Sequence, residues 1–173
     1  MAWKVDPEGS KIEFVAKHFR VTTVRGRFEL FEGTLEMFEE NPQASSVAGT
    51  VDTASIKTGI SMRDSNLRGA GRFDAGRFPK MSFQSTRIGE FEGDNFQVYG
   101  DLTIKDITRP VVFDVVNKGE MPAKGGARRW VFGGSIVVNR KDFDITWNAF
   151  FETGSLFVAD EIKGEFEIQF VQE

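Results

Sequence analysis

Apolar and polar residues alternate along most of this chain, and this alternation limits the folds available to it. In one run, Phe96, Val98, Gly100, Leu102 and Ile104 alternate with more polar neighbours. Successive side chains of a β-strand point to opposite faces, so a period of two predicts strands with one buried face. Similar runs cover residues 12–18, 24–30, 47–51, 81–88, 130–138 and 162–170, and residues 111–116 are apolar on both faces. The sequence therefore predicts an all-β fold.

The apolar residues are of the kinds that favour strands. The 173 residues include 18 Phe, 16 Val and 10 Ile but only 5 Leu. Aromatic and β-branched residues favour strands, whereas Leu favours helices. Turn signals separate the runs, for example at residues 92–95 and 108–110. Length and strand spacing predict one domain over residues 1–173, either a sandwich or an up-and-down barrel.

Composition excludes several classes of function. The chain has no Cys and one His, His18, which excludes disulfides, zinc–thiolate sites and multi-histidine metal sites. We expect no metal and no catalytic cofactor. The net charge of −4 argues against nucleic-acid binding, and no apolar run approaches the length of a membrane span. The start lacks the apolar stretch of a secretory signal, so we expect a cytoplasmic protein, or a periplasmic one if a signal peptide has been removed.

The alternation stops between residues 53 and 79, and we interpret this segment as a lid inserted into the domain. Residues 61–68 predict one or two helical turns with Ser61 as the N-terminal cap. Arg63 and Asp64 predict a buried ion pair that anchors the lid, in preference to a contact with a ligand. The large apolar residues of the lid are Leu67, Phe73 and Phe78.

The lid is also the basic part of the chain. Residues 53–80 hold six basic and two acidic residues, a net charge of +4 that leaves −8 for the rest. A cationic lid over an apolar lumen would fit a ligand with an anionic head and an apolar tail. The alternative is that these basic residues pair with acidic residues on the outer faces of neighbouring strands.

Glycine recurs between larger apolar residues on the predicted inner faces, at Gly26, Gly49, Gly100, Gly134 and Gly164. Glycine inside a strand lowers stability through lost packing and greater conformational entropy of the unfolded chain. Its recurrence at these positions therefore indicates a structural or functional role. The glycines could let strongly coiled strands bend as the sheet closes. They could also leave space in a barrel that a ligand fills. The two interpretations are compatible.

Eighteen Phe with a single Tyr give an inner face that suits an apolar chain better than a sugar or a nucleotide, although an ordinary Phe-rich core is the alternative. The ligand-binding candidates in the lumen and mouth are Phe14, Ala16, His18, Val24, Gly26, Phe28, Met81, Phe83, Val98, Gly100, Leu102, Phe113, Phe132, Gly134, Ile136, Gly164, Phe166 and Ile168. Within this set His18 continues an apolar face, which favours a core or rim residue over a catalytic one.

Several short motifs, spread from Trp3 nearly to the C-terminus, together resemble one known family. They are residues 3–6 (WKVD), 12–14 (IEF) with His18, 24–26 (VRG), 55–59 (SIKTG), 63–64 (RD), 78–79 (FP), 100–111 (GDLTIKDITRPV), 139–143 (NRKDF) and 160–162 (DEI). In these the chain resembles the bacterial YceI-like family of lipocalin-like polyisoprenoid-binding proteins. It departs from the family twice: Gly9 stands where a His is usual before Ser10, and Asp144 follows Phe143 where a Gly is common.

The resemblance implies an extended eight-stranded antiparallel barrel of the lipocalin type, with a short helix in the lid. It also implies a carrier or store that binds a long-chain isoprenoid lipid, a polyprenyl quinone or polyprenyl phosphate, in the lumen without catalysis. A homodimer stays possible. Two other functions stay open: an enzyme acting on an isoprenoid lipid, with His18 or the Arg63–Asp64 pair as the acid–base group, and a structural or stress-related domain whose own side chains fill the lumen.

Overall fold

A computed structural model of the protein describes residues 2–18, 23–122, 124–145 and 158–173. Within these residues eight antiparallel strands close into a barrel, because β1 pairs with both β4 and β11. The barrel strands in spatial order are β1 (Ala2–Val5), β4 (Phe31–Glu36), β5 (Ser46–Asp52), β7 (Lys80–Ile88), β8 (Asn95–Ile104), β9 (Ile107–Pro122), β10 (Arg128–Asn139) and β11 (Val158–Gln172). The predicted all-β barrel is confirmed.

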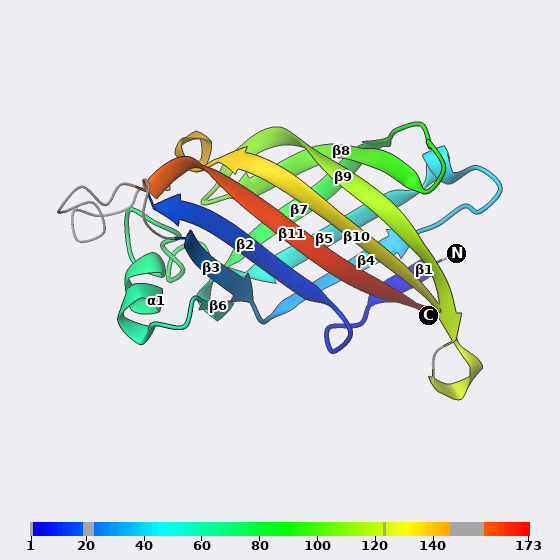
Figure 1. Ribbon diagram of the computed structural model, residues 1–173, viewed down its shortest axis with the longest axis horizontal. Helices are drawn as coiled ribbons and strands as arrows, with labels where there is room; N and C mark the ends of the chain where they lie inside the picture. The colour runs from blue at the N-terminus through cyan, green and yellow to red at the C-terminus, as the bar shows by residue number, and fades with distance from the viewer. Residues whose placement is uncertain (1, 19–22, 123, 146–157) are drawn as a thin grey trace.

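Three further strands lengthen the barrel at one end. They are β2 (Lys11–His18), β3 (Thr23–Phe28) and β6 (Ile56–Lys57), which follow one another outward from β11. The long strand β11 makes this possible, because its first part pairs with β2 and its last residues pair with β1. Figure 1 shows the resulting elongated barrel, with β11 running along most of it.

The helix α1 (Ser61–Leu67) lies in the predicted lid and at one end of the barrel (Figure 1). Its N-cap residue is Ile60, and no side chain accepts a hydrogen bond from the first turn. The prediction that Ser61 caps the helix is therefore wrong by one residue. Four 3-10 turns complete the secondary structure of the described chain: η1 (Pro42–Ala44), η2 (Thr53–Ser55), η3 (Lys124–Gly126) and η4 (Arg140–Phe143).

The turn between β8 and β9 lies at Lys105 and Asp106, not at the predicted residues 108–110. Both residues have positive φ, 54° and 66°, which is the geometry of a tight hairpin turn whose twist matches that of its strands. Residues 108–110 instead belong to β9, where Pro110 pairs with Asp101. The described pairing of β9 with β10 starts only at Asp114, so the missing N–H of a proline is tolerated at position 110.

Strand register defines two ends of the barrel. At the lid end, Asp52 of β5 lies opposite Lys80 of β7, next to α1. At the other end, which we call the rim end, β4 and β5 are joined by residues 37–45, and β7 and β8 by residues 89–94. Figure 1 shows α1 and these two loops at opposite ends of the molecule.

The largest buried cluster lies at the lid end. There α1 inserts Leu67 among Phe28, Ile56 and Phe143, all at most 7% exposed. A second cluster, at the rim end, contains Trp3, Leu35 and Phe170, and a third contains Ile88, Val98 and Val115. Side chains of all three clusters line an open lumen, among them Leu67, Phe170 and Val98.

Candidate functional site

A cavity of about 670 Å³ runs inside the barrel from the lid end to the rim end. Its wall is mostly apolar, and phenylalanine is the dominant residue. The lining phenylalanines are Phe14, Phe28, Phe31, Phe38, Phe73, Phe83, Phe91, Phe96, Phe113, Phe132, Phe143, Phe166 and Phe170. Such a wall offers an apolar ligand dispersion contacts and release from water, and offers few hydrogen bonds.

The rings contact one another in groups along the cavity. From the rim, Phe91 packs on Phe96 with ring centroids 4.6 Å apart, and Phe96 contacts Phe132 at 6.2 Å. In the middle, Phe113 touches both Phe83 (4.9 Å) and Phe166 (5.7 Å). Most of these pairs are edge-to-face, an arrangement favourable for aromatic rings. The rings therefore hold one another in place and keep the lumen from collapsing.

Many of the predicted site residues line this cavity. They are Phe14, Phe28, Met81, Phe83, Val98, Leu102, Phe113, Phe132, Ile136, Gly164, Phe166 and Ile168 of the strands, with Leu67 and Phe73 of the lid. The strand positions follow from the period of two, since every second residue of a closed barrel faces inward.

Ala16 and Val24 do not line the cavity. Both are buried, at 0% and 2% exposure, in the cluster at the lid end, where they contribute to packing. Phe78 does not line the cavity either: its carbonyl accepts a hydrogen bond from Thr53 Oγ1, and the Arg77 guanidinium lies over its ring. The side chain of His18, at the end of β2, lies outside the described residues.

Three of the predicted lumen glycines face a phenyl ring instead of free space. The pairs are Gly26 with Phe14, Gly100 with Phe83, and Gly134 with Phe166, each ring coming from a neighbouring strand. A Cβ atom added at any of these glycines would lie less than 3.0 Å from the ring. The expectation that these three leave room for a ligand is therefore wrong; they make room for the rings of the wall. Gly49 and Gly164 do line the cavity.

Arg63 and Asp64 do not form the predicted ion pair with each other; both bind Thr58. The Asp64 carboxylate, 4% exposed, accepts hydrogen bonds from Thr58 N (2.9 Å) and Thr58 Oγ1. The Arg63 guanidinium donates to Thr58 Oγ1 (2.9 Å) and Thr58 O (2.8 Å). The two charged groups thus fasten α1 to the segment after β6. Neither residue lines the cavity.

The cavity reaches the surface at the rim end, through residues that sequence reasoning missed. Phe38 and Phe91 line it and are 45% and 39% exposed. They lie in the loops 37–45 and 89–94, and Glu39 and Pro42 border the same opening. We call Phe38, Glu39, Pro42 and Phe91 the rim. Alternation could not identify these residues because they belong to loops that strand pairing brings together.

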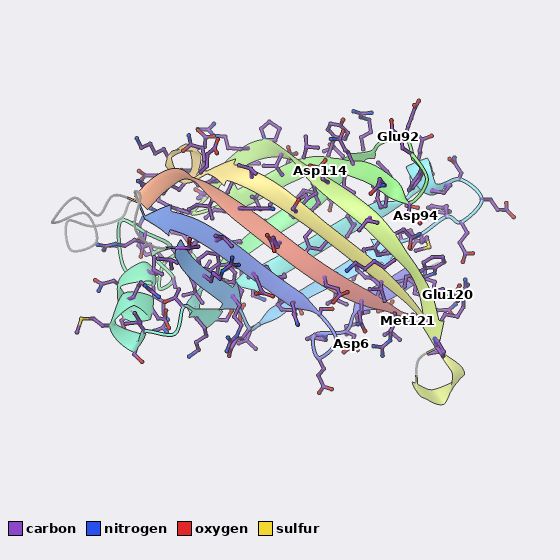
Figure 2. All side chains as sticks on the ribbon, viewed as in Figure 1. Asp6, Glu92, Asp94, Asp114, Glu120 and Met121 are labelled. Carbon is purple, nitrogen blue, oxygen red and sulfur yellow. The ribbon has the colours of Figure 1, made fainter. Side chains whose placement is uncertain are left out.

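The rim end is acidic. Glu39, Glu40, Glu92 and Asp94 are exposed there, and Figure 2 shows Glu92, Asp94 and Glu120 at the end opposite α1. The basic lid therefore lies at the other end of the barrel from the rim, contrary to the expectation of a cationic mouth. Of the lid cations, Lys80 lies near the strand acids Glu32 (3.6 Å) and Asp52 (3.9 Å).

Arg128 links the rim loop 37–45 to the strands of the barrel. Its guanidinium binds Glu39 Oε1 at 2.9 Å and Glu120 Oε1 at 2.5 Å, and lies 5.3 Å from the centre of the Trp3 ring. The hydrogen bond from Arg128 lowers the pKa of Glu120 from its ordinary value of 4.5. The same two carboxylates raise the pKa of Arg128. The loop 37–45 is thereby connected to β9 and β10 beside the opening.

Arg140 was also missed as a site residue, although it lies in one of the motifs. It is 7% exposed, lines the cavity near the lid end and donates a hydrogen bond from Nη1 to Ile145 O at 3.0 Å. The neighbouring departure from the family pattern, Asp144, adopts a left-handed φ of 54°. Glycine adopts this conformation freely and Asp tolerates it.

The described residues contain no group of three or more His, Asp or Glu side chains placed to hold a metal ion. The described chain also contains no helix that is long and apolar enough to cross a membrane.

Comparison with known proteins matches the whole barrel. The YceI-like domain matches residues 3–170. Protein YceI of Salmonella newport is 33% identical over 146 residues, which cover 83% of this chain and 76% of that protein. The crystal structure of Burkholderia cenocepacia BcnA superposes with a TM-score of 0.81 and 28% identity, covering 95% of this chain and 98% of that one.

A more distant neighbour shares the fold at 14% identity. It is a polyisoprenoid binding domain from Saccharophagus degradans, with a TM-score of 0.73 over 99% of this chain and 98% of that one. Because the YceI-like domain spans nearly the whole chain and the curated relatives match most of it, the protein belongs to the YceI-like family.

Proposed function

We propose that this protein binds a long-chain isoprenoid lipid in its barrel and carries or stores it without changing it chemically. The observation that supports this most is the phenylalanine-lined cavity that runs between the two ends of the barrel. Each CH₂ group moved from water into such a wall contributes about 0.8 kcal/mol. A distant structural neighbour is a polyisoprenoid binding domain, which supports the same ligand class.

The acidic rim favours a neutral head group, as in a polyprenyl quinone. A polar head is costly to bury without partners, so we expect it to stay at the exposed end of the cavity. There it would meet Glu39 and Glu40 on one loop and Glu92 and Asp94 on the other. Glu39 is paired with Arg128, and the other three carboxylates would repel a phosphate but not a quinone ring. Phe38 and Phe91 offer such a ring two exposed aromatic partners.

A polyprenyl phosphate is the second candidate, and Arg140 is the observation in its favour. The buried guanidinium lines the cavity near the lid end, so a ligand that entered head first could place an anionic group beside it.

A non-catalytic role agrees with the state of the Arg63–Asp64 pair, one of the two acid–base candidates. Arg63 and Asp64 are engaged with Thr58 and stand outside the cavity wall. General acid–base catalysis needs a group within hydrogen-bond reach of the substrate.

Extraction and titration test the proposal. We expect organic extracts of freshly purified protein to contain a polyprenyl quinone, enriched over the host membrane, by mass spectrometry. Delipidated protein should bind a polyprenyl quinone more tightly than a polyprenyl phosphate of equal chain length. The reverse order would favour the head-first arrangement at Arg140. Failure to bind either lipid would leave the structural-domain interpretation, and consumption of the bound lipid would show an enzyme.

A further inference from the structure

The lid end of the barrel exposes two large apolar side chains that its packing does not require. Ile60, the N-cap residue of α1, is 52% exposed, and Met62 in its first turn is 65% exposed. The same short helix buries Leu67 at 1% and Asp64 at 4% exposure. One side of α1 therefore holds the lid to the barrel, while Ile60 and Met62 are left to solvent.

Basic side chains accompany these two residues. Lys57 is exposed, and the Arg77 side chain is 76% exposed. Arg68 and Arg72 are half-buried and donate to main-chain carbonyls, those of Ala54 and Ala70. Among the described residues no carboxylate lies within 4 Å of Lys57, Arg68 or Arg72, so their charges are not neutralised by a described ion pair.

The two lid acids do little to offset these charges. Asp64 is buried against Thr58. Asp74 is 3.5 Å from Arg77 and its side chain is 15% exposed. The lid therefore presents apolar side chains within a positive surface, while the rim end is negative.

We propose that this surface, formed by Lys57, Ile60, Met62, Arg68 and Arg72, docks the protein onto a bilayer that carries anionic phospholipids. Apolar side chains flanked by cations are the combination that binds such an interface: the side chains enter the boundary between head groups and acyl chains, and the cations are attracted to the anionic lipids. Because this surface is positively charged, an anionic bilayer is the partner that we propose for it. The proposal concerns a surface outside the cavity and does not depend on which lipid the cavity binds.

The charge distribution also sets the orientation. An anionic surface attracts the lid end and repels Glu92 and Asp94 at the rim. Figure 2 shows Glu92, Asp94 and Glu120 at the end of the barrel opposite α1. In a docked molecule the barrel axis therefore points away from the membrane and the rim faces water.

Single-site labelling tests the contact directly, because the chain has no Cys. Met62→Cys carries a polarity-sensitive fluorophore, and Val137→Cys, on β10 and 60% exposed, is the matched control. With vesicles of phosphatidylcholine and phosphatidylglycerol we expect a blue shift at position 62 and none at position 137. Vesicles of phosphatidylcholine alone should give no shift. No shift with anionic vesicles, or equal shifts at the two positions, would overturn the proposal.

Sedimentation with the same vesicles separates the contribution of the cations to binding from that of the apolar side chains. Lys57→Gln and Arg68→Gln should each weaken binding about fivefold, and added salt should weaken it further. Ile60→Ser with Met62→Ser should lower binding, whereas Met121→Ser, at a side chain 46% exposed on β9 at the rim end (Figure 2), should not. Circular dichroism checks that each variant folds. Isoprenoid affinity in solution should stay unchanged in all of them, so a failed docking experiment is distinguishable from a failed lipid-binding one.

Discussion

The phenyl ring of Phe166 lies over Gly134, its register partner on the neighbouring strand β10. A Cβ atom at position 134 would come within 3.0 Å of the ring and 2.6 Å of the Asp114 carbonyl oxygen on β9. Gly134→Ala must therefore push the ring toward the lumen or spread the strands. We expect the free energy of unfolding, measured by urea denaturation, to fall by about 1–3 kcal/mol.

The adjacent Gly133 provides the control. A Cβ atom there would meet only the end of the flexible Lys118 side chain at 2.8 Å, apart from Val116 Cγ1 at 3.5 Å. Gly133→Ala should change stability by no more than about 0.5 kcal/mol. If the two alanine variants lost equal stability, the close approach of the Phe166 ring would not be what requires glycine at position 134.

Gly164 should respond differently, because it lines the cavity. The nearest atom to a Cβ there is Ile136 Cγ2 at 3.0 Å, and the next contact lies at 3.9 Å. Gly164→Leu should therefore place its side chain in the lumen where a ligand would lie. We expect isoprenoid affinity to fall at least tenfold, with a smaller loss of apo-protein stability than Gly134→Ala causes. Titration of delipidated protein and thermal melts measure the two effects; unchanged affinity would contradict this placement.

The strands and much of the cavity wall were predictable because alternation is a local property. Phe83, Phe113 and Phe166 face inward for the reason the sequence indicated, a period of two in a closed sheet. Which side chain packs against a glycine, in contrast, is not a local property of the sequence. Whether the space above Gly100 is empty depends on its register with β7, which brings Phe83 over it, and no signal within β8 specifies that register.

The position of the opening was unpredictable for a similar reason. The basic segment 53–80 is visible in the sequence, but the barrel places it at the end away from Phe38 and Phe91. Those two residues are 53 positions apart in the sequence, and they line the same opening because β5 pairs with β7. Thr58 was missed as well, since the adjacent opposite charges of Arg63 and Asp64 favoured a direct pair over a shared hydroxyl partner.

Asp64 should control how firmly the lid is held. Asp64→Ala removes the acceptor of two Thr58 hydrogen bonds and leaves a main-chain N–H without a partner, which typically costs about 1–3 kcal/mol. We expect faster amide hydrogen exchange and faster proteolysis across residues 57–68, with little change in β8 or β9. Asp64→Asn keeps one carbonyl oxygen at this position and should retain part of the protection.

Ser65→Ala, at an exposed neighbour in α1, serves as the control and should exchange like the native protein. If Asp64→Ala left exchange unchanged but weakened binding of polyprenyl phosphate alone, Asp64 would act on the ligand through Arg63 and not on the lid.

The contribution of Glu120 to stability should depend on pH in a defined direction. Arg128 lowers the pKa of this carboxylate below 4.5 in the folded protein by donating a hydrogen bond to it. A group whose pKa is lower in the folded state stabilises that state above its unfolded pKa, and the stabilisation is lost as pH falls through the folded pKa. The melting temperature of Glu120→Gln should therefore lie below that of the native protein near neutral pH, and the difference should shrink as pH drops below about 4.5. The pair is exposed to solvent, so salt should shrink the difference too.

Glu165→Gln, which removes an exposed carboxylate 3.4 Å from Lys163, is the matched control for Glu120→Gln. Its ion pair is formed with a single flexible lysine instead of the forked guanidinium of Arg128, so the change in melting temperature should be smaller. Protonation of Glu120 in the native protein should remove the same charged hydrogen bond from Arg128 that the substitution removes. A difference in melting temperature between Glu120→Gln and the native protein that stayed constant from neutral to acid pH would therefore contradict the role of this hydrogen bond.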